Sequence, residues 1–137
     1  MNLSPVTVIG NLTADPEVTT TSSGHKRATF SVAVEHRYKQ GDEWTSKPSF
    51  FNVTVWRQTA DRVEQLLTKG MGVIVIGRLD QRTWENDGQK RSIVSIEADN
   101  VAINVWSVDS VTRRQAGSGG GGSSSSPSTP GPDESPW

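Results

Sequence analysis

The chain has 137 residues, and its 14 Lys and Arg are nearly balanced by 15 Asp and Glu, giving a formal net charge of −1. This balance excludes the broad basic excess of a protein that coats duplex nucleic acid. The absence of cysteine excludes a disulfide framework, a thiolate nucleophile and a Cys-based metal site. The sequence shows neither a signal peptide nor a run near the ~18 apolar residues of a membrane span, so we expect a cytoplasmic protein.

The composition changes sharply near the end of the chain. From Ala116 onward the residues are almost all Gly, Ser and Pro, which cannot bury enough apolar surface to fold. We therefore predict one folded domain over residues 1–115, a disordered linker over 116–132 and an acidic tip over 133–137. A domain of this size holds one compact core and leaves little room for a separate catalytic domain.

The first half of the domain is predicted to be β-structure. Short runs rich in β-branched residues, separated by turn residues, predict three strands, over residues 6–12, 26–38 and 48–57. In the second run Phe30, Val32 and Val34 recur at period two, as in a half-buried strand. The polar segment 39–47 between the second and third runs is expected to be a loop with Gly41-Asp42 as its turn.

The second half begins with a change of period. Apolar residues at 60, 63, 66 and 67 lie on one helical stripe, so we predict a helix over 59–67 with Thr59 as its N-cap. Two further strands are predicted over 73–84 and 89–97, joined by the hairpin turn Asn86-Asp87-Gly88. A last alternating stretch runs over 101–108.

This order of elements predicts the fold class. Three strands, one short helix and two more strands match an all-β, five-stranded OB-fold Greek-key barrel with the helix between strands 3 and 4, followed here by the disordered C-terminal tail. An SH3-like barrel or a sandwich would account for the strands, but not for a single helix in this place.

The third strand presents two different faces. Its alternation directs Phe51, Val53 and Val55 toward the core. The opposite, outer face carries Phe50, Asn52, Thr54 and Trp56. The two outer rings are separated by roughly 20 Å of strand, too far to pack on each other. An exposed Trp stabilises nothing in a monomer, so this face is predicted to cover a ligand or a partner.

The fourth strand repeats the pattern, with Arg78, Asp80, Arg82 and Trp84 on one face. Aromatic rings stack on bases and guanidinium groups bind phosphates, so the combination favours a nucleic-acid surface. Stacking requires unstacked bases and reads no base edge, which indicates single strands bound without sequence preference. Two alternatives stay open: the aromatic residues are oligomer contacts, or the charged residues are an ordinary solvated face.

The sequence offers little for catalysis, and we expect no enzyme, no metal and no cofactor. His25 and His36 are the only histidines, and no group of carboxylates has metal-ligand spacing. Gly70-Met71-Gly72 lacks the third glycine of a dinucleotide-binding fingerprint. The run Gly119–Gly122 is not followed by the Lys-Ser/Thr of a phosphate-binding loop.

Several motifs carry a resemblance to a known family. They are Val8-Ile9-Gly10-Asn11-Leu12, Asp15-Pro16-Glu17-Val18, the strand 28–34, Lys69-Gly70, Ile76-Gly77-Arg78-Leu79 and Arg82-Thr83-Trp84. In this order and spacing, over about residues 6–101, the chain resembles the bacterial single-stranded DNA-binding protein (SSB) family. The resemblance implies an OB fold, usually a homotetramer, that binds single-stranded DNA in replication, recombination and repair, in the cytoplasm and associated with the nucleoid.

The resemblance also implies site residues. The family's four base-stacking positions match Tyr38, Phe50, Trp56 and Trp84. Together with the strand patterns, this gives six further predicted DNA contacts: Asn52, Thr54, Arg78, Arg82, Lys90 and Arg91. Tyr38 has the parity of the core-facing Val34, so it reaches the outer surface only if its strand bulges or has left the barrel wall by that point.

The tail resembles the family's acidic tip, which docks replication and repair proteins. The corresponding partner-binding residues here are Asp133, Glu134, Pro136 and Trp137. The tip has fewer acids than is usual and ends in Trp in place of Phe, so an inert solubilising tail is an alternative. Two functional alternatives follow: a specialised SSB paralogue with little recruitment through its tail, or an OB-fold protein-interaction module. RNA is a third possible ligand class.

Overall fold

The computed structural model describes residues 1–115; the predicted linker 116–132 and tip 133–137 lie outside the described residues. Six strands and one α-helix make up the described part. In chain order they are β1 (Pro5–Leu12), β2 (Glu17–Thr20), β3 (Lys26–Gln40), β4 (Glu43–Trp56), α1 (Arg57–Leu66), β5 (Gly72–Asn86) and β6 (Gln89–Ile103), followed by the 3₁₀ turn η1 (Val105–Ser107).

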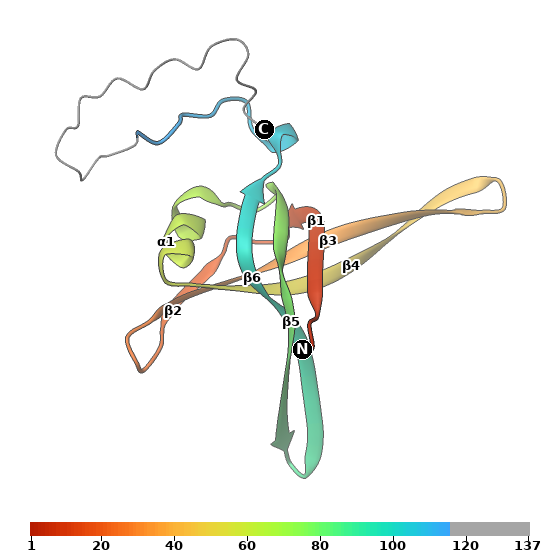
Figure 1. Cartoon of the computed structure of the whole chain (residues 1–137). Helices are drawn as coiled ribbons and strands as arrows, with labels where there is room; N and C mark the ends of the chain where they lie inside the picture. Colours follow the sequence, from red (N-terminus) through yellow and green to blue (C-terminus); the bar gives the residue numbers. More distant parts are fainter. Residues whose placement is uncertain (116–137) are drawn as a thin grey trace.

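Five of the strands close into a barrel. The sheet order is β1-β5-β6-β4-β3-β2, and β1 also pairs with β3 through Asn11↔Ala33 and Leu12↔Val32. The pairing of β4 with β6 is parallel, and the other pairings are antiparallel. The predicted five-stranded OB-type barrel is confirmed, with the helix between its third and fourth long strands (Figure 1). The short β2 is added to it along β3.

The core fills the inside of the barrel with alternate residues of the strands. The largest fully buried side chains are Val32, Val53, Val55, Val73, Val75 and Ile96. Ala60 and Val63 of α1, with Leu67 just after it, belong to the same buried cluster. Burial of these apolar side chains is the main term that stabilises the barrel.

The structure differs from the prediction at β2 and at the start of the helix. Strand β2 was not expected, because only Val18 of its four residues is even half-buried and so short a segment shows no period. The helix begins at Arg57, and its N-cap is Trp56, which makes no side-chain capping hydrogen bond. Thr59 is therefore not the N-cap. Arg57 adopts a left-handed φ of 56°, which turns the chain directly from β4 into the helix.

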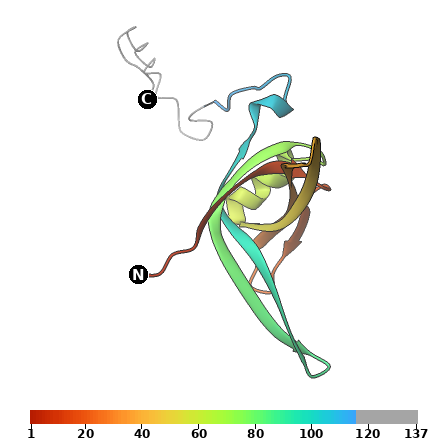
Figure 2. The same cartoon turned by 90° about the vertical axis from the view of Figure 1, so that its right-hand side faces the viewer.

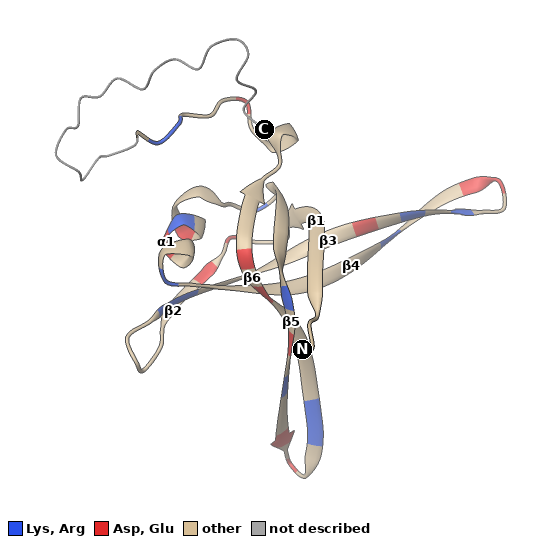
Figure 3. Cartoon of the chain, viewed as in Figure 1, with Lys and Arg blue, Asp and Glu red and all other residues tan. Residues whose placement is uncertain are grey.

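Two long hairpins leave the barrel, β3–β4 and β5–β6 (Figures 1 and 2). The expected loop 39–47 is wrong except for its turn, because β3 and β4 stay paired as far as Gln40↔Glu43. These residues are exposed and mostly polar, so hydrophobic periodicity could not detect them. In the second hairpin Asp87 and Gly88 both have positive φ and the strands pair as far as Asn86↔Gln89, which confirms the predicted turn. Both hairpins carry charges of both signs (Figure 3).

Strand β6 continues past its predicted end through a bulge. The pair Ile76↔Asn100 is followed by Gly77↔Ala98, so Asp99 is an extra residue on β6. The strand then runs on to Ile103, so the expected separate stretch 101–108 is instead the end of β6 followed by η1. A Cβ on Gly77 would collide with the carbonyl oxygen of Glu97 and lie 2.8 Å from Cα of Ala98. Only glycine allows β6 to approach this closely.

We expect Gly77→Ala to destabilise the barrel, because the methyl group meets backbone atoms that cannot move independently. The loss should be about 1–3 kcal/mol, as for other overpacked sites, measured as a lower midpoint of urea unfolding. Ser92→Ala, an exposed change in the same hairpin, is the control and should stay within about 0.5 kcal/mol of the parent. Equal midpoints for the two variants would show that the close approach at Gly77 is not required.

Candidate nucleic-acid interface

A groove of about 410 Å³ crosses the outer face of the barrel, lined by side chains of β3, β4, β5 and β6. The outward-facing β4 residues in it are Asn52, Thr54 and Trp56, and the buried Val53 also borders it. These three point outward because Val53 and Val55, which alternate with them, are fully buried. The predicted parity of this strand is therefore confirmed, and its outer face is the floor of the groove.

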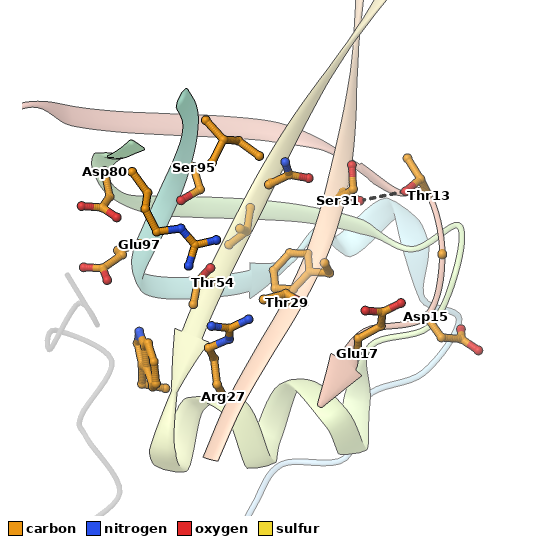
Figure 4. A pocket seen from close by; sticks show the side chains of 17 residues that line it. Thr13, Asp15, Glu17, Arg27, Thr29, Ser31, Thr54, Asp80, Ser95 and Glu97 are labelled. Atoms are coloured by element: carbon orange, nitrogen blue, oxygen red, sulfur yellow. Dashed lines mark hydrogen bonds between the residues drawn. The ribbon is translucent and has the colours of Figure 1, made fainter. Parts of the chain in front are cut away.

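Strands β5 and β6 form one side of the groove. Asp80 and Arg82 come from β5 and lie opposite Ser95 and Ile93 of β6. Figure 4 shows Arg27 and Thr54 close to the middle of the groove, with Asp80 on one side. Of the ten predicted DNA contacts, the groove brings together Asn52, Thr54, Trp56 and Arg82.

Phe50 and Tyr38 lie on the β3–β4 hairpin, beyond the groove. Phe50 continues the outer face of β4 opposite Ala33 and is 63% exposed. Tyr38 is also exposed, because β3 has left the barrel wall from Glu35 onward. This is one of the two ways in which a residue with the parity of Val34 was expected to reach the surface. By alternation, however, Tyr38 lies on the other face of this hairpin from Phe50.

Trp84, Lys90 and Arg91 lie on the β5–β6 hairpin. Trp84 is exposed directly opposite Arg91, so the two share a face. Lys90 is opposite Glu85 and lies on the reverse side of the hairpin. Trp84 and Arg91 thus continue the face that carries Arg82, whereas Lys90 does not.

Arg78 is the predicted contact that the structure places least favourably. Its Nη2 donates to Oε2 of Glu97 at 2.6 Å and its Nη1 to Oδ1 of Asp99 at 3.4 Å. Its partners come from β6, and Asp99 is the extra residue of the bulge. The guanidinium is thus already engaged by two carboxylates, which for this residue favours the alternative of an ordinary solvated, charged face.

Arg27 is a groove residue that the sequence interpretation missed. It lies directly opposite Trp56 on β3, and its guanidinium carbon is 6.0 Å from the centre of the indole ring, at the limit of a cation–π contact. Its Nε is buried without a hydrogen-bond partner among the described residues. A signal was present, since Arg27 alternates with the core residues Ala28 and Phe30, but only the core face of this strand was considered.

The charges around the groove leave two guanidinium groups free. Within residues 1–115, Lys26 and Arg78 are the only cations that take part in the four ion pairs. Lys26 hydrogen bonds to Asp61 and Glu64 of α1, and these carboxylates raise its pKa above the usual range. Arg27 and Arg82 keep their charges for an external anion, beside acids at the rim of the groove.

Two general features of the described residues bear on chemistry. Among residues 1–115, no three His, Asp or Glu side chains are grouped so that they could hold a metal ion. None of the helices in that range has the length and apolar character needed to cross a membrane.

The sequence model of the Single-strand binding protein family matches residues 3–104. The chain belongs to this family. The family is one of binding proteins, not of enzymes, as we expected from the sequence.

Individual relatives agree with this assignment. The chain is 40% identical over 102 residues to a single-stranded DNA-binding protein of Treponema pallidum, covering 74% of this chain and 58% of that one. It is 46% identical over 100 residues to one of Corynebacterium glutamicum, covering 70% and 44%. The match thus spans about half the length of these curated relatives.

Solved structures of related proteins share the fold. The SSB of Plasmodium falciparum, solved in complex with single-stranded DNA, superposes with a TM-score of 0.69 at 25% identity, covering 76% of this chain and 96% of that one. The small single-stranded DNA-binding protein of Streptomyces coelicolor gives 0.65 at 31% identity, covering 77% and 98%.

Proposed function

We propose that this chain binds single-stranded DNA without sequence preference, along the groove and the aromatic faces of the two hairpins. The observation that carries the proposal is the pairing of Trp56 with Arg27 in the groove, beside Arg82. The related P. falciparum protein, solved with single-stranded DNA, supports the choice of ligand.

The geometry favours unpaired bases. Phe50 and Trp56 lie six residues apart on one strand face, roughly 20 Å, so the two rings cannot pack against each other. Each is free to stack on a base, and a base inside a duplex is not available for such stacking. Arg82 and Arg27 supply the charge for the phosphates between the stacked bases.

A role in replication, recombination and repair, in the bacterial cytoplasm at the nucleoid, is part of the proposal and is supported by membership of the family. Recruitment of partner proteins through Asp133, Glu134, Pro136 and Trp137 stays a prediction, because these residues lie outside the described part of the chain. A specialised paralogue that recruits little through this tail would bind DNA equally well.

We also propose that the chain assembles with copies of itself, as a homotetramer. Ile9 on β1 and Ile76 on β5 are exposed large apolar residues on the outer side of the same strand pair. Adjacent exposed apolar side chains of this kind mark protein interaction sites. A second copy that pairs through this face would bury them.

We expect Trp56→Ala to weaken binding of oligo-dT by roughly 1–3 kcal/mol per stacked base, because the groove loses its stacking ring. Fluorescence anisotropy of labelled oligo-dT measures the change, and circular dichroism checks that the barrel is intact. Trp106→Ala is the matched control, since Trp106 is 92% exposed and lies in η1, away from the groove. Parental affinity in Trp56→Ala would contradict the stacking role, and a parent that fails to bind would favour a protein-interaction module.

We expect Arg82→Ala to lower the salt dependence of binding, because a free guanidinium releases counterions when it contacts a phosphate. The slope of log K against log salt should fall by about 0.7 for one phosphate of a single strand. Arg78→Ala should change the slope less, since Glu97 and Asp99 already hold this side chain. The reverse order would show that Arg78 exchanges its carboxylates for phosphates.

We expect Ile9→Glu to dissociate the assembly, because it places a charge in the buried apolar contact. Light scattering coupled to size exclusion should then give a smaller mass than for the parent chain. Leu66→Glu, an exposed apolar site on α1, should leave the mass unchanged. A parent that is already monomeric would contradict the proposed assembly without affecting the DNA-binding proposal.

A further inference from the structure

Trp44 is a large aromatic residue that the interface described above does not use. It lies near the start of β4, two residues beyond the hairpin turn, and is 66% exposed. It belongs to the segment 39–47 that the sequence predicted to be a loop. Because β4 begins at Glu43, Trp44 is a strand residue with a defined face.

That face is the outer face of the interface. Trp44, Phe50 and Trp56 occupy every sixth position of β4 and have the same parity. Ser46 and Pro48, which lie between Trp44 and Phe50 on this face, are small or compact. The ring of Trp44 is therefore on a continuous face that leads into the groove, and the right-handed twist of the hairpin turns this face gradually along its length.

Basic residues accompany Trp44 on the same face. Lys39 is directly opposite Trp44, and Arg37 is opposite Ser46. Glu35, opposite Pro48, is the acid on this face, and Asp42 and Glu43 lie at the turn. Among residues 1–115, Lys39 and Arg37 take part in no ion pair. The tip thus repeats the combination of the groove, a ring with adjacent cations.

We propose that Trp44, with Lys39 and Arg37, forms a further base-stacking subsite for single-stranded DNA at the tip of the β3–β4 hairpin. The subsite lengthens the path of the strand beyond Phe50. It rests on the proposed function, because it is a continuation of the same outer face. Charge complementarity between the two cations and phosphate, and continuity with the groove, identify nucleic acid as the occupant.

The spacing of the three rings sets the oligonucleotide lengths that distinguish the tip from the groove. Trp44 is roughly 20 Å from Phe50 and roughly 40 Å from Trp56 along the strand. At ~3.4 Å per stacked nucleotide, each interval holds at most about six nucleotides. An oligonucleotide of about six nucleotides therefore fills the stretch between Phe50 and Trp56, and one of about 20 reaches the tip.

The test compares Trp44→Ala with the parent, as full chains, on oligo-dT of about six and about 20 nucleotides. Loss of one stacked base should weaken binding of the longer oligonucleotide by at least roughly fivefold and leave the shorter one unchanged. Trp44→Phe should retain most of the affinity for the longer strand, with less fluorescence quenching than the parent. Trp106→Ala, which removes an exposed Trp elsewhere, should match the parent on both.

The outcomes separate this proposal from the one it rests on. If Trp44→Ala binds both lengths like the parent while Trp56→Ala binds weakly, the tip subsite is wrong and the groove stands. If the parent binds neither oligonucleotide, the DNA-binding function itself is wrong. If Trp44→Ala weakens both lengths equally and light scattering shows a changed mass, Trp44 is an assembly contact and the subsite is overturned.

Discussion

The pairs Asn11↔Ala33 and Leu12↔Val32 join β1 to β3 and close the strands into a barrel. In a closed barrel, every second residue of a strand faces a packed interior and the others face outward. Because Val53 and Val55 are fixed inside by close packing, the side chains that alternate with them must point outward. The groove is therefore a consequence of the core, and its residues need no interactions of their own to be positioned.

The two hairpins depend on the barrel in another way. A two-stranded ribbon is marginally stable by itself, and here each ribbon is the continuation of two barrel strands. Once past the barrel wall, both faces of a ribbon are exposed, and aromatic residues such as Tyr38 and Trp84 gain nothing from the core. Their exposure has a physical reason only if something outside the domain covers them, which is what a bound strand of bases would do.

The sequence predicted the parts of the site that local alternation controls and missed those that depend on distant pairing. Asn52, Thr54 and Trp56 were found because their neighbours are plainly apolar. Trp44 was not predicted to lie on a strand, because that end of β4 has no apolar face and its pairing with β3 leaves no pattern in the sequence. The ion pair of Arg78 with Glu97 follows from the hairpin register, which places the two residues opposite each other, whereas its second contact is made by Asp99, the extra residue of a bulge that alternation does not reveal.

The position of Arg27 adds a property that neither residue of the pair has alone. The guanidinium carbon of Arg27 lies over one side of the Trp56 ring, 6.0 Å from its centre, so in the proposed complex a base would stack on the other side. The same guanidinium forms no ion pair among the described residues. In the proposed complex, a phosphate next to the stacked base is the anion best placed to pair with it. Stacking and charge neutralisation then occur at one point, and neither depends on which base is present.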